Sequence, residues 1–405
     1  MKILIAADTY YPHVNGASYF AQRLAHYLRH RKHEILVIAP SRKFGNEVYH
    51  HYDVRVLGVR SIPIFVYKNF RFSPRVLLGK TIAKAVKTYA PEIVHVQGHF
   101  FICKEVLRTA WDIGLPTVGT NHFMPENLSH YFHLPAFAKE WLERLGWKQF
   151  RAVFEKIDVV TTPTKTAAQL LQQIGLQREV LPISCGIDRS RFSPSANGTS
   201  LKRKYNLPEN KKMLLVVGRL DKEKNIDLIL RGFSRVTRRM NLHCVIAGRG
   251  AEESRLKGLV RTLGLDEHVT FTGFVPDEDL PGLYAAADCF IIAGTAELQS
   301  IVTMEAMATG LPVIGVRAMA LPELIQPGIN GCLFEAGDKD GLADCITTVF
   351  SDDSLRKEMG RASLAIIARH DIEQTIDQFE MIYKRLIAKR QNQPARIPAS
   401  PPAHI

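Results

Sequence analysis

Short apolar runs alternate along the chain with longer segments in which apolar residues recur every three or four positions. At the start, residues 2–7 and 33–39 are apolar runs, and residues 17–31 between them carry Phe20 and Leu24 on one side of a predicted helix. A strand, a helix and a second strand in this order predict a βαβ unit. Such a unit implies a parallel sheet whose ligands bind beyond the carboxyl ends of the strands.

The alternation continues in two series. In the first series, the predicted strands are 54–57, 93–96, 117–119 and 159–163, and the predicted helices are 74–89 and 165–174. In the second series, the predicted strands are 213–217, 242–247 and 269–272, and the predicted helices are 226–235, 253–263 and 277–286. A linker rich in Pro, Ser, Asn and Gly separates them near residues 181–200. Because 405 residues are also too many for one ordinary core, we expect two α/β domains, 1–185 and 195–370.

The stretch 289–316 carries candidate chemistry. An apolar run leads into a loop with Glu297 and a predicted helix, 300–309, with Glu305; Gly310 then suits the left-handed position after a helix. Because the helix begins between the two carboxylates, its free N–H groups face the same pocket as the loop. Carboxylates accept hydrogen bonds from sugar hydroxyls, and helix N-terminal amides hold phosphate, so this stretch suits a sugar nucleotide. The alternative is that both acids are solvated surface residues.

Two cations occupy the loop after the first strand of the second series. Arg219 can bind a diphosphate in a fork, and Lys224 can bind it as a point charge. No Asp-x-Asp pair follows an apolar strand, and no cluster has the spacing of metal ligands. We therefore expect a site without a metal ion, in which these cations stabilise the negative charge.

Candidate residues in the first series follow its strands. Gly16 opens a predicted helix and lets the backbone approach an anion closely, although an ordinary strand–helix turn also explains it. His99 and His122 follow strands that end at the expected cleft, and His122 can hydrogen-bond a sugar hydroxyl. A structural role is the alternative for both histidines.

The net charge of +13 is concentrated in the first domain. Residues 1–180 hold 24 Lys and Arg against 13 Asp and Glu, a net of +11, which leaves +2 for the rest. Such an excess fits nucleic acid, an anionic membrane surface or simple solubility. The charges do not follow a helix-turn-helix, a zinc module or an RNA-binding strand, so we expect no nucleic-acid partner.

Location and redox state follow from what the sequence lacks. No apolar run is long enough to span a bilayer and no signal peptide precedes the first strand, so we expect a cytoplasmic protein. The six cysteines show no Cys-x-x-Cys spacing and are expected to be reduced, packed thiols.

Residues 134–157 interleave aromatic and basic side chains at helical spacing, including Phe137, Trp141, Lys148 and Arg151. This pattern fits a helix that lies at a membrane interface. A core-facing helix with a solvated basic face is the alternative.

Taken together, the motifs resemble the retaining family-4 glycosyltransferases of GT-B fold. The features that carry the resemblance are Gly218-Arg219 with Glu223-Lys224, Glu297 with Glu305, the run EAMATGLPVI, the loop 12–16 and the linker CGIDRSRF. It covers nearly the whole chain to about residue 388. The loop around residues 121–131 further resembles that of members that glycosylate diacylglycerol.

The resemblance implies two Rossmann-like doubly wound domains that face each other across a cleft. A nucleoside-diphosphate sugar would bind in the second domain, and an acceptor mainly in the first. Residues 371–389 would form a helix that packs back on the first domain, and we expect residues 390–405, rich in Pro and Ala, to be disordered.

The resemblance also assigns roles to single residues. Arg219 and Lys224 would hold the diphosphate, Glu305 the ribose and Glu297 the donor sugar. The same donor site would include Ser300, Ile301 and the amide of Gly16, and His122 would contact the transferred sugar. Ser300 stands where the family commonly has a glycine before the helix, so the donor sugar stays open.

We therefore expect a retaining transferase that moves a hexose from a UDP- or GDP-linked donor to an acceptor, without a metal ion. The acceptor expected is a membrane glycerolipid, reached from the inner face of the cell membrane by peripheral attachment. The alternatives are a soluble sugar or polysaccharide acceptor, and a sugar-nucleotide epimerase or a phosphorylase on the same architecture.

Overall fold

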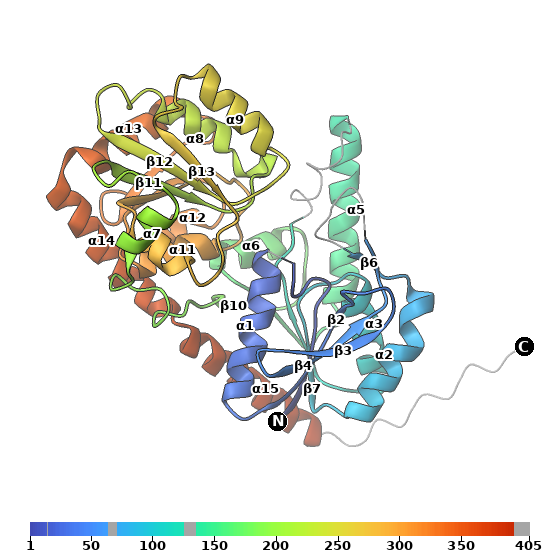
Figure 1. The fold of residues 1–405 in the computed structure, drawn as a ribbon. Coiled ribbons are helices and arrows are strands. Elements are labelled where there is room, and N and C mark those ends of the chain that lie inside the picture. The colour runs from blue at the N-terminus through green and yellow to red at the C-terminus, as the bar shows by residue number, and fades with distance from the viewer. Residues whose placement is uncertain (14, 64–70, 125–134, 393–405) are drawn as a thin grey trace, which may run out of the picture.

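The protein is built from two α/β halves, each with a largely parallel sheet flanked by helices (Figure 1). The computed structural model describes residues 1–13, 15–63, 71–124 and 135–392. This architecture confirms the predicted α/β fold with two Rossmann-like units.

The first half contains an eight-stranded sheet in its described residues, in the order β10-β9-β8-β7-β1-β2-β4-β3. Its strands are β1 (Lys2–Ala6), β2 (Glu34–Pro40), β3 (Glu47–His51), β4 (Val54–Val59), β7 (Ile93–Val96), β8 (Thr117–Thr120), β9 (Val159–Thr162) and β10 (Val180–Pro182). All neighbours are parallel except β3 and β4. Strand β1 lies inside the sheet and is almost fully apolar, because helices cover both of its faces. A two-stranded ribbon pairs β5 (Ile62–Pro63) with β6 (Arg71–Phe72).

The helices of the first half are α1 (Gly16–His30), α2 (Arg75–Tyr89), α3 (Phe101–Asp112), α5 (Ala136–Phe154) and α6 (Lys165–Gln173). Helix α1 begins at Gly16 because Asn15 caps it: the Oδ1 of Asn15 accepts from the Ser18 amide at 2.9 Å. Its buried face, with Phe20 and Leu24, packs on the sheet, while other residues of α1 point toward the second half.

The second half contains a six-stranded parallel sheet in the order β13-β12-β11-β14-β15-β16. Its strands are β11 (Lys212–Val217), β12 (Leu242–Ala247), β13 (Val269–Gly273), β14 (Cys289–Ile292), β15 (Val313–Val316) and β16 (Gly331–Phe334). Its helices are α7 (Gly198–Lys204), α8 (Ile226–Phe233), α9 (Glu253–Thr262), α10 (Leu280–Ala285), α11 (Ile301–Ala308), α12 (Leu321–Leu324), α13 (Lys339–Ser351) and α14 (Asp353–Ile367), with 3-10 turns η1 (Lys222–Lys224) and η2 (Ala368–His370).

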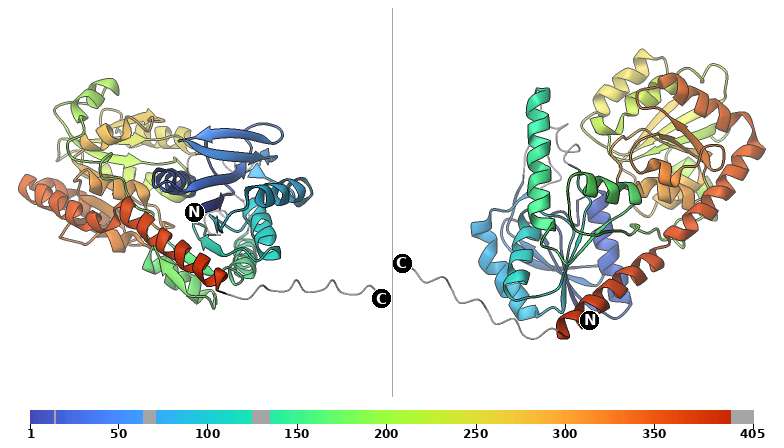
Figure 2. Two further views of the ribbon diagram at one scale, coloured as in Figure 1. Left: turned by 90° about the horizontal axis from the view of Figure 1, so that it is seen from below. Right: turned by 180° about the vertical axis from the view of Figure 1, so that it is seen from behind.

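The chain crosses between the halves twice, and the two crossings lie side by side. The amide of Ile187 donates to the carbonyl of His370 at 2.8 Å, and the amide of Ile372 donates back to Ile187 at 3.1 Å. Helix α15 (Ile372–Gln391) then runs along the first half, as the view from behind shows (Figure 2). There Tyr383 is fully buried, and its hydroxyl lies 2.6 Å from Nδ1 of His95 in β7.

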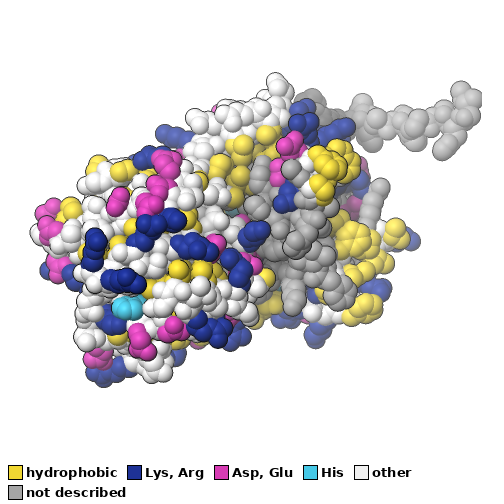
Figure 3. Space-filling model, turned by 90° about the horizontal axis from the view of Figure 1, so that it is seen from above, with side chains coloured by type: hydrophobic (Ala, Val, Ile, Leu, Met, Phe, Trp, Pro, Cys, Tyr) yellow, Lys and Arg dark blue, Asp and Glu magenta, His cyan; other side chains and the backbone are white. Residues whose placement is uncertain are grey.

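Helix α5 is buried at one end and exposed at the other, so the core-facing interpretation of its sequence applies to only part of it. Its C-terminal end is core, with Phe150 and Phe154 fully buried. Its N-terminal end rises away from the first sheet (Figures 1 and 2), and Phe137 and Trp141 there are 76% and 63% exposed. Seen from above, exposed hydrophobic side chains lie there among Lys, Arg, Asp and Glu (Figure 3).

Two sequence predictions need correction, and others lie outside the described residues. Cys332 and Cys345 form a disulfide between β16 and α13, so the prediction of six reduced thiols holds only for the four that stay free and buried. The predicted helix 277–286 is only α10, because Pro281 occupies its first turn. The proposed lipid-acceptor loop falls largely on residues 125–134, and the expected tail on 393–405, none of which is described.

Candidate active site

A cavity of about 920 Å³ lies between the halves. On one side it is lined by the carboxyl ends of β11, β12 and β14, at Val217, Ala247 and Ile292. The facing wall is α1 of the first half, from Gly16 to Tyr27. Parallel strands deliver their following loops to one edge of the sheet, which is why this edge collects the polar residues.

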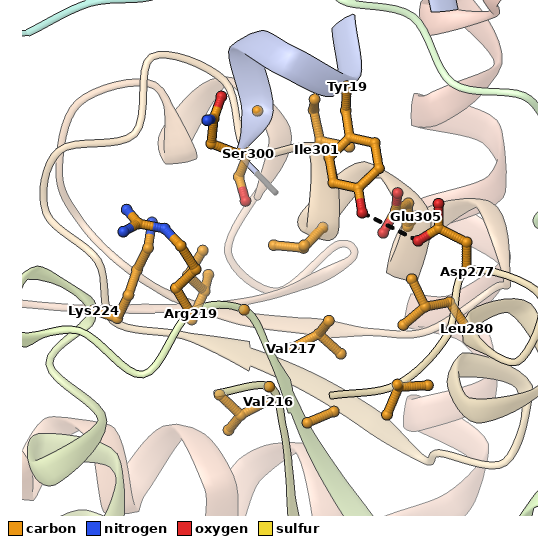
Figure 4. A pocket seen from close by; sticks show the side chains of 18 of the residues that line it. Tyr19, Val216, Val217, Arg219, Lys224, Asp277, Leu280, Ser300, Ile301 and Glu305 are labelled. Atoms are coloured by element: carbon orange, nitrogen blue, oxygen red, sulfur yellow. Dashed lines mark hydrogen bonds between the residues drawn. The ribbon is translucent and has the colours of Figure 1, made fainter. Parts of the chain in front are cut away.

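Two cations stand at one end of the cavity (Figure 4). The Nζ of Lys224 donates to Oε1 of Glu297 at 2.7 Å, and Nη2 of Arg219 donates to Oε1 of Glu223 at 2.8 Å. Arg219 also donates to Asp221. Both cations follow β11, and the 3-10 turn η1 holds Lys224 in place. The arrangement brings Arg219, Lys224 and Glu297 together, as the sequence predicted.

The backbone packs very closely beside these cations. Gly248 has a φ of 144°, and a Cβ at this position would lie 1.8 Å from the carbonyl oxygen of Gly218. Only glycine fits there, so the loops after β11 and β12 can lie directly against each other. Both glycines line the cavity and expose backbone to it.

Helix α11 starts at the cavity with a capped N-terminus. Ser300 is 1% exposed, and its Oγ accepts from the Thr303 amide at 3.3 Å and from the Thr303 hydroxyl at 2.8 Å. The hydroxyl of Ser300 therefore serves the helix as its cap. Ile301, the next residue, approaches α1: its Cδ1 lies 3.9 Å from where a Cβ on Gly16 would be. Gly16, Ser300 and Ile301 all line the cavity, with the positive end of α11 beside them.

Glu305 lies one turn further along α11. Its Oε2 accepts a hydrogen bond from the hydroxyl of Tyr284 at 3.0 Å. Burial raises the pKa of Glu305 to about 7, although the positive charge of Arg23 and the Tyr284 bond oppose this rise. Glu305 is therefore a partly desolvated carboxylate that faces the cavity, and the interpretation of it as a solvated surface acid is wrong.

Two hydrogen bonds connect Asp277 of the second half to other walls of the cavity, one from α1 and one from the segment that links the halves. The hydroxyl of Tyr19 donates to Oδ1 of Asp277 at 3.1 Å (Figure 4), and Nη2 of Arg191 donates to the carbonyl of Asp277 at 2.5 Å. Tyr19, Arg23, Arg191 and Asp277 all line the cavity, and none of the four was predicted from the sequence. The signal for two of them was the stripe of Gly16, Tyr19 and Arg23 on one face of α1.

His122 lies outside the set of described residues that line the cavity. It follows β8, its ring packs 4.8 Å from that of Phe20, and its Nε2 lies 3.0 Å from Oε1 of Gln97. Burial lowers the pKa of His122 to about 3, so the ring is neutral. Because the Oε1 of Gln97 can only accept, Nε2 carries the proton in this contact and Nδ1 is left as an acceptor. His99 is 3% exposed among the rings of Phe100, Phe123 and Phe150, which fits its structural alternative.

Within the residues that the structure describes, no group of three His, Cys, Asp or Glu side chains is placed to hold a metal ion. Over the same residues, no helix has the length and apolar character needed to cross a membrane.

Two family models match the chain, one for each half. A model described as Glycosyltransferase Family 4 matches residues 14–191, and a model described as Glycosyl transferases group 1 matches residues 198–364. Solved structures share the fold. The sucrose-phosphate synthase of Thermosynechococcus elongatus superimposes with a TM-score of 0.77 at 20% identity, over 96% of this chain and all of the other. Anabaena HepE in complex with UDP-glucose superimposes with a TM-score of 0.75 at 19% identity, over 95% and 100%.

The fold, the cavity and these matches define a glycosyltransferase of GT-B fold that uses a nucleotide sugar. Two relatives with named activities are similar to most of the chain. The chain is 28% identical over 341 residues to the alpha-monoglucosyldiacylglycerol synthase of Streptococcus pneumoniae, which covers 82% of this chain and 75% of that protein. It is 26% identical over 395 residues to a GDP-mannose-dependent alpha-mannosyltransferase of Corynebacterium glutamicum, with coverage of 97% and 91%. The chain belongs to the family-4 glycosyltransferases, and the resemblance seen in its motifs is confirmed.

Proposed function

We propose that this enzyme transfers a hexose from a UDP- or GDP-linked donor to a hydroxyl of its acceptor, with retention of the anomeric configuration. The observation that carries the proposal is one cavity that combines two cations, Arg219 and Lys224, with two carboxylates and the N-terminus of α11. A nucleoside-diphosphate sugar needs cations for its diphosphate and acceptors for its hydroxyls, and this cavity offers both.

The cations act on the leaving group. Breaking the anomeric carbon–oxygen bond moves negative charge onto the departing diphosphate and leaves positive charge on the sugar. Arg219, Lys224 and the α11 amides are already held in position, so they stabilise that charge without reorganising during the reaction. No metal ion is assigned to this step, because the cations of the chain provide the charge.

The carboxylates orient the rest of the donor. Glu305 accepts from ribose hydroxyls, while Glu297 accepts from the donor sugar and is itself held by Lys224. The amide of Gly16 reaches the phosphates from the opposite half. His122 contacts the transferred sugar through its free Nδ1 once the donor and acceptor halves draw together, because its Nε2 is engaged by Gln97.

The donor is tested directly. Purified protein is screened with UDP-, GDP- and ADP-sugars for thermal stabilisation, and the best donor is incubated with acceptor panels. We expect release of UDP or GDP only with an acceptor, and a product whose anomeric proton coupling in NMR matches that of the donor. A product of inverted configuration would overturn retention, and conversion of the donor without an acceptor would favour the epimerase.

For the acceptor we propose a membrane glycerolipid. Supporting observations are the exposed Phe137 and Trp141 at the projecting end of α5, the basic first half, and the name of the pneumococcal relative. The other relative is named as a GDP-mannose-dependent mannosyltransferase, so a different acceptor is the alternative. Parallel assays with diacylglycerol in mixed micelles and with soluble oligosaccharides decide, since only one panel should yield a glycosylated product. Transfer to the oligosaccharides alone would overturn the lipid proposal and leave the donor proposal intact.

A further inference from the structure

Arg23 is an unexplained cation in the wall of the cavity. It projects from α1 of the first half and lines the same cavity as Glu305 of the second half. Its Nε and Nη2 are shielded from solvent and have no hydrogen-bond partner in the described structure. Leaving buried donors unsatisfied is costly, so the site suits a ligand that brings an acceptor.

The first turns of α1 explain why Arg23 points into the cavity. Gly16, Tyr19 and Arg23 are spaced by four or fewer residues and therefore share one face of the helix. The first of them lies beside Ile301, and the second donates to Asp277. These two contacts fix α1 against the second half, and Arg23 stands one turn beyond them.

Glu305 carries the opposite charge and lines the same cavity as Arg23. Although burial is the largest influence on its pKa, Arg23 is the strongest of the charges that act against the rise. No ion pair joins the two residues, and the carboxylate bonds instead through one oxygen to Tyr284. A guanidinium and a carboxylate thus share the cavity without bonding each other directly.

A hydroxyl group is the ligand that best fits both the guanidinium of Arg23 and the carboxylate of Glu305. A hydroxyl donates one hydrogen bond to a carboxylate and accepts another from a guanidinium, so it satisfies both residues. An anionic group would satisfy Arg23 but be repelled by Glu305 and by the nearby Asp277. Arg191 is less suited to this role, because its guanidinium already donates to the carbonyl of Asp277.

We propose that Arg23 is a donor-binding residue whose guanidinium donates to a ribose hydroxyl that in turn donates to Glu305. This inference rests on the proposed function, in which Glu305 holds the ribose. The nucleoside is then held from both halves of the molecule, so the half that receives the acceptor also recognises the donor. Bound nucleotide would stabilise the contact between α1 and α11.

The proposal is tested by calorimetric titration of the full chain. UDP and GDP are compared, and the nucleotide that binds the wild type more tightly is titrated again as its 2′,3′-dideoxy form. Arg23→Met should weaken binding of the ribose nucleotide roughly tenfold to a hundredfold, the range expected for a hydrogen bond to a charged group. Binding of the dideoxy form should change by less than about threefold in the same variant, since its bridging hydroxyls are missing.

Arg29→Ala is the matched control, since Arg29 is an exposed residue of the same helix. Arg23→Lys, which keeps the charge, replaces Arg23→Met if melting shows that the latter does not fold. Equal losses for both nucleotides, or none, would overturn the role of Arg23 while leaving the donor proposal standing. If the wild type binds both forms equally, the ribose role of Glu305 fails as well, and if it binds no nucleotide the donor proposal itself fails.

Discussion

Lys224 and Glu297 form an ion pair of 2.7 Å although they lie 73 residues apart in the chain. Both side chains are largely buried, at 28% and 15% exposure. The pair links the loop after β11 to the loop after β14, next to the N-terminus of α11. In the proposed donor complex, the diphosphate would meet a cation already held in position, and the sugar would meet a carboxylate with a fixed orientation.

Replacing Lys224 tests whether this pair serves the reaction. Lys224→Ala should lower kcat/KM by about 10² to 10³, the usual effect of removing one preorganised group that stabilises developing charge. The melting temperature should change little, because Lys224 lies on a loop at the cavity. Glu297→Ala should show a loss of similar size. The measurement is the steady-state rate of UDP or GDP release.

Lys222→Ala is the control for that experiment, since Lys222 is an exposed cation two residues away in η1. Its rate should stay within a factor of two of the wild type. Near-normal kcat/KM in Lys224→Ala would contradict the assignment, and so would a melting temperature that falls below the assay temperature.

A second prediction concerns the stability of the protein as a function of pH. Burial raises the pKa of Glu305 from its ordinary value of 4.5 to about 7, so the folded state binds this proton more tightly than the unfolded chain. The carboxylate form therefore destabilises the fold above about pH 7, and this effect disappears below about pH 4.5. Glu305→Gln should melt at a higher temperature than the wild type at pH 8, and the difference should shrink by pH 5.

Glu278→Gln serves as the comparison because Glu278 is an exposed acid in the same half. Its melting temperature should follow the wild type at both pH values. An equal gain at pH 5 and pH 8 in Glu305→Gln would show that the variant acts through packing and not through the buried charge. Reduced nucleotide affinity in the stabilised variant would show that the buried carboxylate of Glu305, although it destabilises the fold, contributes to nucleotide binding.

The parts of this structure that depend on local sequence were predictable. Helix α11 and its flanking strands follow from apolar runs, a loop and Gly310, and the observed helix Ile301–Ala308 lies within the predicted range. Helix α3 was missed because its N-terminus has no capping side chain of its own. Its amides at Phe100 and Ile102 donate to Asp8 instead, at 3.0 and 2.8 Å, and Asp8 lies more than ninety residues earlier.

Contacts between the two halves could not be predicted from the sequence. Tyr19 and Asp277 are separated by 258 residues, and their hydrogen bond depends on how the two sheets face each other. The Cys332–Cys345 disulfide likewise joins a strand to the following helix, with no spacing that distinguishes it from packed thiols. Local motifs indicated the residues of the proposed donor site that lie in the second half, whereas Tyr19 and Arg23 of α1 were found to line the same cavity only in the structure.

A third prediction concerns α15 and the first half. Tyr383→Phe removes the hydroxyl that lies 2.6 Å from Nδ1 of His95 and leaves a fully buried nitrogen without its partner. A loss of about 1–3 kcal/mol in unfolding free energy is expected, seen as a lower melting temperature. Met381→Ala, at an exposed position of the same helix, should have little effect.

Truncations extend the same argument. Deleting residues 371–405 removes the buried Ile376, Phe379 and Tyr383 and should abolish folding or activity. Deleting only 391–405 should leave activity within a few-fold of the wild type. Full activity after the longer deletion would show that α15 is dispensable.

The last prediction tests attachment to a membrane through α5. Its projecting end offers Phe137 and Trp141 for insertion, and Lys148 and Arg151 lie exposed further along. Each basic residue near an anionic surface contributes about 1 kcal/mol, so several of them suffice for reversible binding. In sedimentation assays, binding to liposomes should rise with the fraction of anionic lipid and fall with salt.

Two double variants of α5 test which side chains are responsible. Phe137→Ser with Trp141→Ser, or Lys148→Glu with Arg151→Glu, should weaken binding roughly tenfold or more. Ile329→Ser, which removes an exposed apolar residue of the second half, should bind like the wild type. Equal recovery of the wild type in the supernatant with and without anionic liposomes would exclude the membrane proposal and leave the nucleotide-sugar chemistry untouched.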